Sequence, residues 1–390
     1  MPEKKESVVP RLRFPEFRNA GEWERYRFRQ LLTLEYGVSL PEESRLGGVI
    51  PVVGSNGVVG FHNQALISGP AIIVGRKGSA GEINWIESDC YPIDTTFYVK
   101  LESQDTLLAF IKLLLENTNL TCLSDNGAVP GLNRNDVYVL KTALPHEPEQ
   151  QKIAECLSSL DEVIDLEAQK LDALKAHKKG LMQQLFPREG ETIPRLRFPE
   201  FWDAGEWEVK QLGEVCSTFS GGTPNSSTKE YYGGSIPFIR SAEINQDRTE
   251  LFLTEEGFKN SSAKLVVKGD ILIALYGANS GDGALSKIDG AINQAILCLR
   301  SKFNHIFILD YWRLRKNEIV MQYIQGGQGN LSAEIVKSIA FAFPSPSEQQ
   351  KIADCLASLD EVINLQTQKL DALKAHKKGL MQQLFPQEVN

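Results

Sequence analysis

The chain has 390 residues, of which 42% are hydrophobic and 24% charged, and its formal net charge is -8. This length is too great for one ordinary hydrophobic core, and the composition is that of a folded globular protein rather than a disordered or fibrous one. No run approaches the ~20 apolar residues that span a bilayer, and the charged N-terminus does not resemble a secretion signal. We therefore expect a cytoplasmic protein without membrane contact.

A short motif opens each half of the chain. PRLRFPEF at residues 10–17 recurs at 194–201, and GEWE follows both copies, with an offset of 184. A 39-residue stretch at 149–187 returns at 348–386 with 34 identical positions and an offset of 199. The sequence therefore contains two copies of one plan, which is an internal repeat.

The repeats flank two regions that share little sequence, residues 20–145 (the N-terminal variable domain) and 205–344 (the C-terminal variable domain). Both are predicted to contain short strands, loops and one helix. The change of offset from 184 to 199 places 15 extra residues in the second copy, between about Glu208 and Gly269. A duplicated frame with two unlike surfaces suits a protein that reads an asymmetric, two-part target.

Two glycine-rich loops follow buried-strand patterns, in AIIVGRKGSAG (71–81) and in DILIALYGANSG (270–281). Such loops can present side-chain donors to bases and phosphates, as can the turn-rich stretches at 51–63 and 220–245. A plain surface turn after a core strand would explain either loop equally well. The candidate DNA-contacting residues are Ser55, Asn56, His62, Arg76, Lys77, Ser79, Lys229, Arg240, Ser241, Asn245, Tyr276 and Asn279.

Each 39-residue repeat has the 3.5-residue apolar period of a coiled coil. The seam consists of Ile153, Leu157, Leu160, Ile164, Leu171, Leu174, Leu181 and Leu185, and of Ile352, Leu356, Leu359, Ile363, Leu370, Leu373, Leu380 and Leu384. About 36 residues at ~1.5 Å each give rods of roughly 54 Å. The first part of each helix is acidic and the second part basic, so only antiparallel pairing sets opposite charges together. We predict an antiparallel pair.

The seam also has polar positions, Glu167 and Lys178 in the first copy and Gln366 and Lys377 in the second. These layers either set the register or are simply solvated, and the sequence favours the solvated alternative. Pro148 is expected just ahead of the first helical turn of one helix, and Ser347 with Gln350 is a candidate capping box for the other.

The sequence shows no motif of an enzyme that acts on nucleic acid. It lacks an Asn-Pro-Pro-Tyr methylation motif, a phosphate loop ending in Gly-Lys-Ser/Thr, and a helical His-Glu pair. The six cysteines and five histidines are dispersed, so we expect no metal site. The chain is therefore predicted to have no catalytic residues and to bind no cofactor.

The combination of EQQKIA at the start of each long helix, KLDALKAHKKGLMQQLFP at its end, PRLRFPEF with GEWE, and the SGGTP and IPFIRSAEIN stretches resembles the specificity subunit of type I restriction-modification systems. The resemblance covers almost the whole chain. It implies an α+β fold in which two mixed α/β target recognition domains are separated by a pair of long antiparallel coiled-coil helices with pseudo-two-fold symmetry. The implied division is 1–147 and 188–344 for the recognition domains, and 148–187 and 345–390 for the helices.

What the resemblance implies is a non-catalytic, sequence-specific DNA-binding subunit. Each domain would read one half of an asymmetric bipartite site in double-stranded DNA, about 10 bp or ~34 Å apart. The helices would set the gap and dock two methylation subunits, which carry S-adenosylmethionine. Restriction and translocation subunits with ATP and Mg would join them. These partners would also share the phosphate contacts that an acidic chain cannot supply alone.

Two alternatives remain open from the residues. A methyltransferase that keeps its own chemistry would need a cofactor pocket, and a coiled-coil adaptor that binds only proteins would fit the acidic charge.

Overall fold

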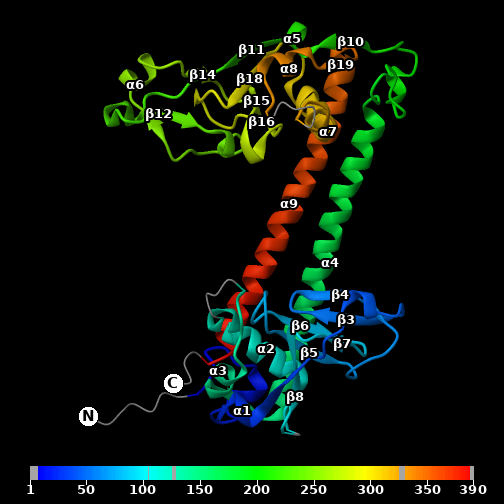
Figure 1. The fold of residues 1–390 in the computed structure, drawn as a ribbon, viewed down its shortest axis with the longest axis vertical. Coiled ribbons are helices and arrows are strands. Elements are labelled where there is room, and N and C mark those ends of the chain that lie inside the picture. Colours follow the sequence, from blue (N-terminus) through cyan, green and yellow to red (C-terminus); the bar gives the residue numbers. More distant parts are fainter. Residues whose placement is uncertain (1–7, 104, 125–128, 325–329, 387–390) are drawn as a thin grey trace. The chain divides into compact units, whose positions relative to one another are not determined.

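The structure, a computed structural model, describes residues 8–103, 105–124, 129–324 and 330–386. It divides into two compact units, Met1–Ala168 with Gln368–Asn390, and Gln169–Thr367. Each unit therefore contains one variable domain together with part of both long helices, α4 (Glu147–Leu185) and α9 (Pro346–Leu384) (Figure 1). The helices begin within one residue of the predicted starts at 148 and 345, while the predicted domain ends at 1–7 and 387–390 lie outside the described residues.

The first turn of each long helix differs from the prediction. Pro148 and Ser347 both lie inside their helices rather than ahead of them. Ser345, not Ser347, has the capping position, because its Oγ accepts a hydrogen bond from the backbone N–H of Glu348 at 3.4 Å. Pro346 then occupies the first helical position, where its missing N–H costs nothing.

The N-terminal variable domain is built from short elements around a four-stranded antiparallel sheet. Its strands are β1 (Glu24–Arg27), β2 (Leu32–Tyr36), β3 (Ile50–Gly54), β4 (Gly57–His62), β5 (Ala71–Gly75), β6 (Ile83–Ile86), β7 (Tyr91–Pro92), β8 (Thr96–Leu101) and β9 (Lys141–Leu144). Its helices are α1 (Phe28–Leu31), α2 (Leu108–Thr118) and α3 (Arg134–Val139), with 3-10 turns η2 (Glu42–Ser44) and η3 (Leu120–Leu123), and the 3-10 turn η1 (Pro15–Phe17) precedes the domain. The main sheet has the order β2-β8-β5-β6, and smaller sheets have the orders β4-β3-β7 and β1-β9.

The C-terminal variable domain repeats this plan. Its strands are β10 (Glu208–Gln211), β11 (Cys216–Ser220), β12 (Tyr232–Ile239), β13 (Phe252–Leu253), β14 (Lys264–Val266), β15 (Ile271–Ala274), β16 (Gly283–Leu285), β17 (Gly290–Ile292), β18 (Ile296–Ser301) and β19 (Ala340–Phe343). Its helices are α5 (Leu212–Val215), α6 (Glu255–Lys259), α7 (His305–Ile324) and α8 (Ala333–Ser338), with 3-10 turns η5 (Lys229–Tyr231), η6 (Ser241–Glu243) and η7 (Gly277–Asn279), and the 3-10 turn η4 (Pro199–Phe201) precedes the domain.

The sheet orders match those of the first domain, with β11-β18-β15-β16 as the main sheet and β10-β19 as the pair. The second sheet, β13-β12-β17-β14, has one strand more than β4-β3-β7. That extra strand, β14, and helix α6 lie between residues 208 and 269. The predicted position of the 15 extra residues is therefore confirmed.

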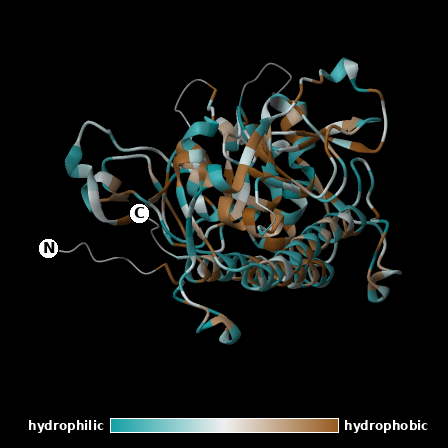
Figure 2. Cartoon of the chain, turned by 90° about the horizontal axis from the view of Figure 1, so that it is seen from below, coloured by the Kyte–Doolittle hydropathy of each residue, from teal (hydrophilic) through white to brown (hydrophobic). Residues whose placement is uncertain are grey.

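The two central strands explain why the sequence folds in this way. All residues of β5 and of β15 are buried, because each strand is paired on both edges and covered on both faces. Continuous apolar runs such as AIIV and ILIA are typical of strands in that environment. In Figure 2 the strands near the middle of the picture are largely hydrophobic, whereas the long helices alternate hydrophobic and hydrophilic residues.

The tryptophan of each GEWE motif packs at the end of a long helix. Trp23 contacts Phe385, which directly follows α9, with ring centroids 6.1 Å apart. In the other unit Trp207 contacts Phe307 at 5.8 Å, and Phe307 contacts Phe186 after α4 at 5.2 Å. The repeated motif thus ties a helix end to the core of each variable domain.

The long helices run antiparallel within each unit. Lys377 near the end of α9 pairs with Asp161 near the start of α4, and Lys178 near the end of α4 pairs with Asp360 near the start of α9, both with an Nζ–Oδ1 distance of 2.6 Å. The apolar seam is buried or half-buried throughout. The prediction of an antiparallel pair is confirmed, and no helix among the described residues is long and apolar enough to cross a membrane.

The solvated alternative for the polar seam positions is wrong. The side chains of Lys178, Lys377 and Glu167 are only 12%, 17% and 16% exposed, and Gln366 is 6% exposed. The three charged ones form ion pairs with the opposite long helix. Burial beside the apolar seam requires such partners, because an unpaired charge there would lose its hydration without compensation.

Candidate nucleic-acid interface

The loop after β5 is held by a network of backbone hydrogen bonds. The N–H of Gly81 donates to the carbonyl of Gly75 at 2.8 Å, and the N–H of Leu132 donates to the carbonyl of Arg76 at 2.9 Å. Gly81 has φ +84°, a conformation that glycine adopts without strain. These hydrogen bonds therefore give the GRKGSAG loop a fixed backbone conformation.

The loop after β15 has the same network in the other domain. Gly281 donates to the carbonyl of Ala274 at 2.8 Å and has φ +83°, and Leu331 donates to the carbonyl of Leu275 at 3.2 Å. Leu275 thus occupies the position of Arg76. One frame presents a half-buried arginine in one domain and a buried leucine in the other.

The structure brings several N-terminal candidates together. Ser55 and Asn56 form the two-residue turn between β3 and β4. The Ser55 Oγ lies 3.7 Å from the position where a side chain on Gly78 would begin, so this turn lies beside the Arg76 loop. Lys77 is exposed and Ser79 half-buried on the same loop.

Two arginines of this surface contact one tyrosine ring. The guanidinium carbons of Arg76 and Arg134 both lie 4.8 Å from the centroid of Tyr36. Arg76 is also 5.9 Å from Phe97, and Tyr36 contacts Phe97 at 5.1 Å. Tyr36 and Arg134 were not predicted from the sequence, because they lie about 40 and 58 residues from Arg76 and carry no local motif.

His62 must be withdrawn as a candidate contact. Its side chain is 7% exposed, its Nδ1 accepts a hydrogen bond from the backbone N–H of Leu46 at 3.1 Å, and its ring contacts Tyr91 at 5.7 Å. The imidazole therefore fastens the loop before β3 to the end of β4. A buried ring with these partners has no face left for a base.

The C-terminal candidates form a second surface. Ile244 packs in one core cluster with Leu272 and Ala274 of β15. This contact brings the segment with Ser241 and Asn245 beside the strand that leads into Tyr276, which is 40% exposed. Asn279 is half-buried at the end of η7. Lys229 is exposed on η5, and no contact among the described residues links it to the other candidates.

Arg240 is neutralised by two carboxylates, and its contact with a base stays a prediction. Its Nη2 donates to Glu243 at 2.8 Å and to Glu250 at 2.6 Å. The hydrogen bond from Arg240 lowers the pKa of Glu243 to about 2, and these bonds raise the pKa of Arg240 itself. The Arg240 guanidinium thus stabilises the turn after β12. Arg76 and Arg134, in contrast, form no ion pair with a carboxylate among the described residues.

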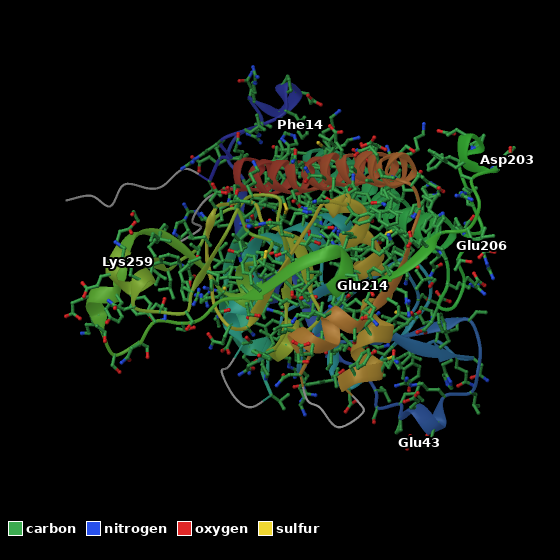
Figure 3. The ribbon with its side chains drawn as sticks, turned by 90° about the horizontal axis from the view of Figure 1, so that it is seen from above. Phe14, Glu43, Asp203, Glu206, Glu214 and Lys259 are labelled. Carbon is green, nitrogen blue, oxygen red and sulfur yellow. The ribbon has the colours of Figure 1, made fainter. Side chains whose placement is uncertain are left out.

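The inserted segment adds further exposed charge. Lys259, at the end of α6, lies at the outer edge of its domain in Figure 3 and is 3.8 Å from Glu255. This ion pair is exposed at both ends and is therefore weak.

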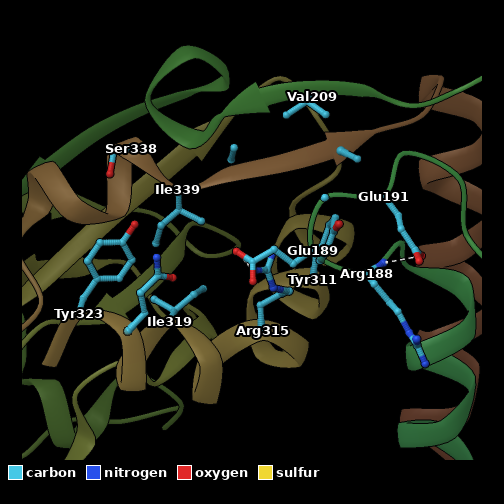
Figure 4. Close-up of a pocket in the computed structure, with 14 residues that line it drawn as sticks. Arg188, Glu189, Glu191, Val209, Tyr311, Arg315, Ile319, Tyr323, Ser338 and Ile339 are labelled. Atoms are coloured by element: carbon cyan, nitrogen blue, oxygen red, sulfur yellow. Dashed lines mark hydrogen bonds and ion pairs between the residues drawn. The ribbon is translucent and has the colours of Figure 1, made fainter. Parts of the chain in front are cut away.

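A cavity of about 360 Å³ lies in the C-terminal unit between residues 188–191, α7 and β19 (Figure 4). Arg315 projects into it, but its guanidinium pairs with Glu189 at 3.0 Å and Glu318 at 2.7 Å. These two carboxylates neutralise the positive charge of Arg315, which is therefore not available to bind a phosphate. Among the described residues no group of three His, Cys, Asp or Glu side chains is arranged to hold a metal ion.

The model of the type I restriction modification DNA specificity domain matches this chain twice, at residues 20–176 and 204–375. The chain is 26% identical to the putative MjaX specificity subunit of Methanocaldococcus jannaschii, over 65% of this chain and 60% of that protein. It is also 26% identical to the MjaVIII specificity subunit of the same organism, over 74% of this chain and 72% of that one. The chain thus spans less than two thirds of the MjaX subunit.

Two solved structures have the same fold. The S subunit of a type I restriction-modification system from M. genitalium matches with a TM-score of 0.66 and 17% identity, over 98% of this chain and all of that one. A chain from a structure described as the basis of complex assembly and conformational transition of the type I R-M system matches with a TM-score of 0.56 and 17% identity, over 93% and 97%. The chain belongs to the type I restriction modification DNA specificity family.

Proposed function

We propose that this chain is the DNA-reading specificity subunit of a type I restriction-modification complex, in which each variable domain reads one half of an asymmetric bipartite site. The observation that carries the proposal is the duplicated frame. The hydrogen bonds that fix the loops after β5 and β15 are equivalent, yet they present Arg76 in one domain and Leu275 in the other. Two copies of one scaffold with different surface chemistry are what a protein needs to read two different short sequences.

The long helices complete this proposal. The helices pair antiparallel in each unit through Lys178–Asp360 and Lys377–Asp161, and they would set the gap between the half-sites. Two methylation subunits would dock on them, and restriction and translocation subunits would join that assembly. S-adenosylmethionine, ATP and Mg would belong to those partners, and this chain would be a cytoplasmic, non-catalytic component.

The acidic net charge of -8 favours a reader that shares its phosphate contacts. DNA affinity depends on the number of neutralised phosphates, and the described N-terminal surface offers only a few cations. The partner subunits would supply the remainder. Binding of the isolated chain to DNA should therefore be weak, and the affinity should rise when the methylation subunits are added.

Methylome sequencing, which maps the methylated adenines of a genome, tests this proposal. The chain is expressed with its methylation subunit in a host that lacks adenine methylation, and each protein is also expressed alone. The proposal expects methylated adenines at one motif with two unlike halves and a fixed gap, only when both proteins are present. Methylation by this chain alone, or a continuous or palindromic motif, would contradict it.

A further inference from the structure

Tyr36 joins the hydrophobic core to the surface of the N-terminal variable domain. It is the last residue of β2 and is 46% exposed, and its backbone partner across the sheet is Phe97, which is 1% exposed. The two rings are 5.1 Å apart. The buried phenylalanine thus supports one side of the tyrosine ring, while the remainder faces the surface on which Arg76 and Arg134 lie.

Each arginine is anchored twice. Besides its contact with the Tyr36 ring, the Nη1 of Arg76 donates to the backbone carbonyl of Asp94 at 2.9 Å, and the Nη1 of Arg134 donates to that of Leu34 at 3.2 Å. A guanidinium has five N–H donors, so both keep donors for another acceptor. Ring contact and carbonyl bond together hold these flexible side chains in place, which reduces the entropy that binding would cost.

The C-terminal variable domain lacks this arrangement at the equivalent positions. The last residue of β11 is Ser220, the residue after the fully buried strand β15 is Leu275, and the first residue of α8 is Ala333. The backbone frame is shared, so the three side chains are not required to build it. Their combination in the N-terminal domain points to a purpose other than folding.

We propose that Tyr36 is a positioning residue that holds Arg76 and Arg134 as one donor surface for a guanine in the half-site read by the N-terminal variable domain. Arginine is suited to the O6 and N7 acceptors of guanine, because its planar donors match both at once. A lysine in either place would supply charge without that geometry. This inference rests on the proposed function and assigns one of its two half-sites to named residues.

The experiment compares the methylomes of complexes that contain the wild-type chain, Tyr36→Leu and Tyr36→Phe. Leucine fills much of the space but has no ring for the guanidinium groups, whereas phenylalanine keeps the ring. With Tyr36→Leu, discrimination at one guanine of the first half-site should fall by about tenfold, which corresponds to about 1.4 kcal/mol. Tyr36→Phe should restore the preference for guanine at that position, and the second half-site should stay unchanged in both.

Two further variants identify the donors. Arg76→Ala and Arg134→Ala should relax the same base pair as Tyr36→Leu, because the three residues act as one unit. The melting temperature of each purified complex is measured in parallel, so that a loss of folded protein is recognised. General destabilisation lowers methylation at every site and leaves the motif intact.

The proposal is overturned if Tyr36→Leu keeps the full motif, if it lowers methylation without changing the motif, or if it relaxes the half-site of the C-terminal domain. Failure of the proposed function looks different. In that case the wild-type complex itself shows no bipartite motif, whereas failure of this inference leaves a wild-type bipartite motif that Tyr36→Leu does not alter.

Discussion

The Nζ of Lys178 lies 2.6 Å from Oδ1 of Asp360, and the side chain of Lys178 is only 12% exposed. Asp310 of α7 contributes to the same cluster. Its carboxylate is 1% exposed, burial raises its pKa, and the nearby charge of Lys178 counteracts that rise. In the other unit Lys377 pairs with Asp161 and lies 3.7 Å from Glu116 of α2. At each of these points a helix of the variable domain and both long helices therefore meet in one charge cluster.

Reversing the charge of Lys178 should destabilise the protein. Lys178→Glu places a third acidic group beside Asp360 and Asp310, and we expect a loss of about 1–3 kcal/mol in the free energy of unfolding. The double variant Lys178→Glu with Asp360→Lys restores opposite charges and should recover more than half of that loss. Chemical denaturation monitored by circular dichroism measures both.

Lys175→Glu is the matched control for this series, because it makes the same change of charge at an exposed position of α4. Its effect should stay within about 0.5 kcal/mol. Equal losses for Lys175→Glu and Lys178→Glu would show that the buried ion pair contributes nothing specific.

The repeated PRLRFPEF motif fastens the chain to the start of a long helix through a bidentate ion pair. The Nε and Nη2 of Arg197 donate to Glu348 at 2.7 Å each, and those of Arg13 donate to Glu149 at 2.7 and 2.6 Å. The side chain of Glu348 is 1% exposed, and the hydrogen bonds that it accepts from Arg197 raise the pKa of Arg197. Glu348→Gln leaves that guanidinium without its anion and should cost about 3 kcal/mol in denaturant unfolding.

Glu200→Gln is the exposed counterpart of that variant. Glu200 pairs with Lys351 at 3.0 Å, and both side chains are about half exposed. Its removal should cost much less stability than Glu348→Gln, because solvent screens such pairs. If the two variants lost the same stability, burial would not be the reason why the Arg197–Glu348 pair matters.

The C-terminal variable domain should lose stability in acid through Glu243. Its ordinary pKa of 4.5 is lowered to about 2 by Arg240, so the stabilisation is complete above pH 4.5 and is lost as the pH falls towards 2. Between about pH 5 and pH 3 the wild-type chain should therefore lose more stability than Glu243→Gln, whose amide does not titrate. Parallel acid dependence of the two proteins would contradict the assignment.

Lys77 should contribute to DNA affinity without contributing to sequence choice. It is exposed on the Arg76 loop and offers a single cation. Lys77→Ala should weaken binding of the complete methylation complex to all DNA sequences and reduce the slope of log K against log salt by about one. The methylated motif should remain that of the wild-type chain; a changed motif would assign Lys77 to base reading instead.

The duplicated frame could be predicted from the sequence because it is local. The 34 identical positions, the 3.5-residue period and the charge polarity of the helices predict an antiparallel pair of long helices without any knowledge of the variable domains. The same local reasoning gave the wrong answer for the polar seam layers. Their burial depends on side chains of α2 and α7, such as Glu116 and Asp310, which lie far away in the sequence.

The candidate contacts were predicted less well, because exposure and ion pairing are tertiary properties. From the sequence alone, a histidine or an arginine in a turn-rich segment is expected to be free to contact DNA. In the fold, the backbone N–H of Leu46 donates to His62, and two glutamates accept hydrogen bonds from Arg240. Conversely, Tyr36 and Arg134 had no local signal and became visible only through their contact with Arg76.

We propose two independent readers in one duplicated frame. Exchanging residues 20–145 for the corresponding region of another specificity subunit, followed by methylome sequencing with the same methylation subunit, tests it most directly. One half of the motif should change, while the other half and the gap should be kept. A simultaneous change of both half-sites would contradict it.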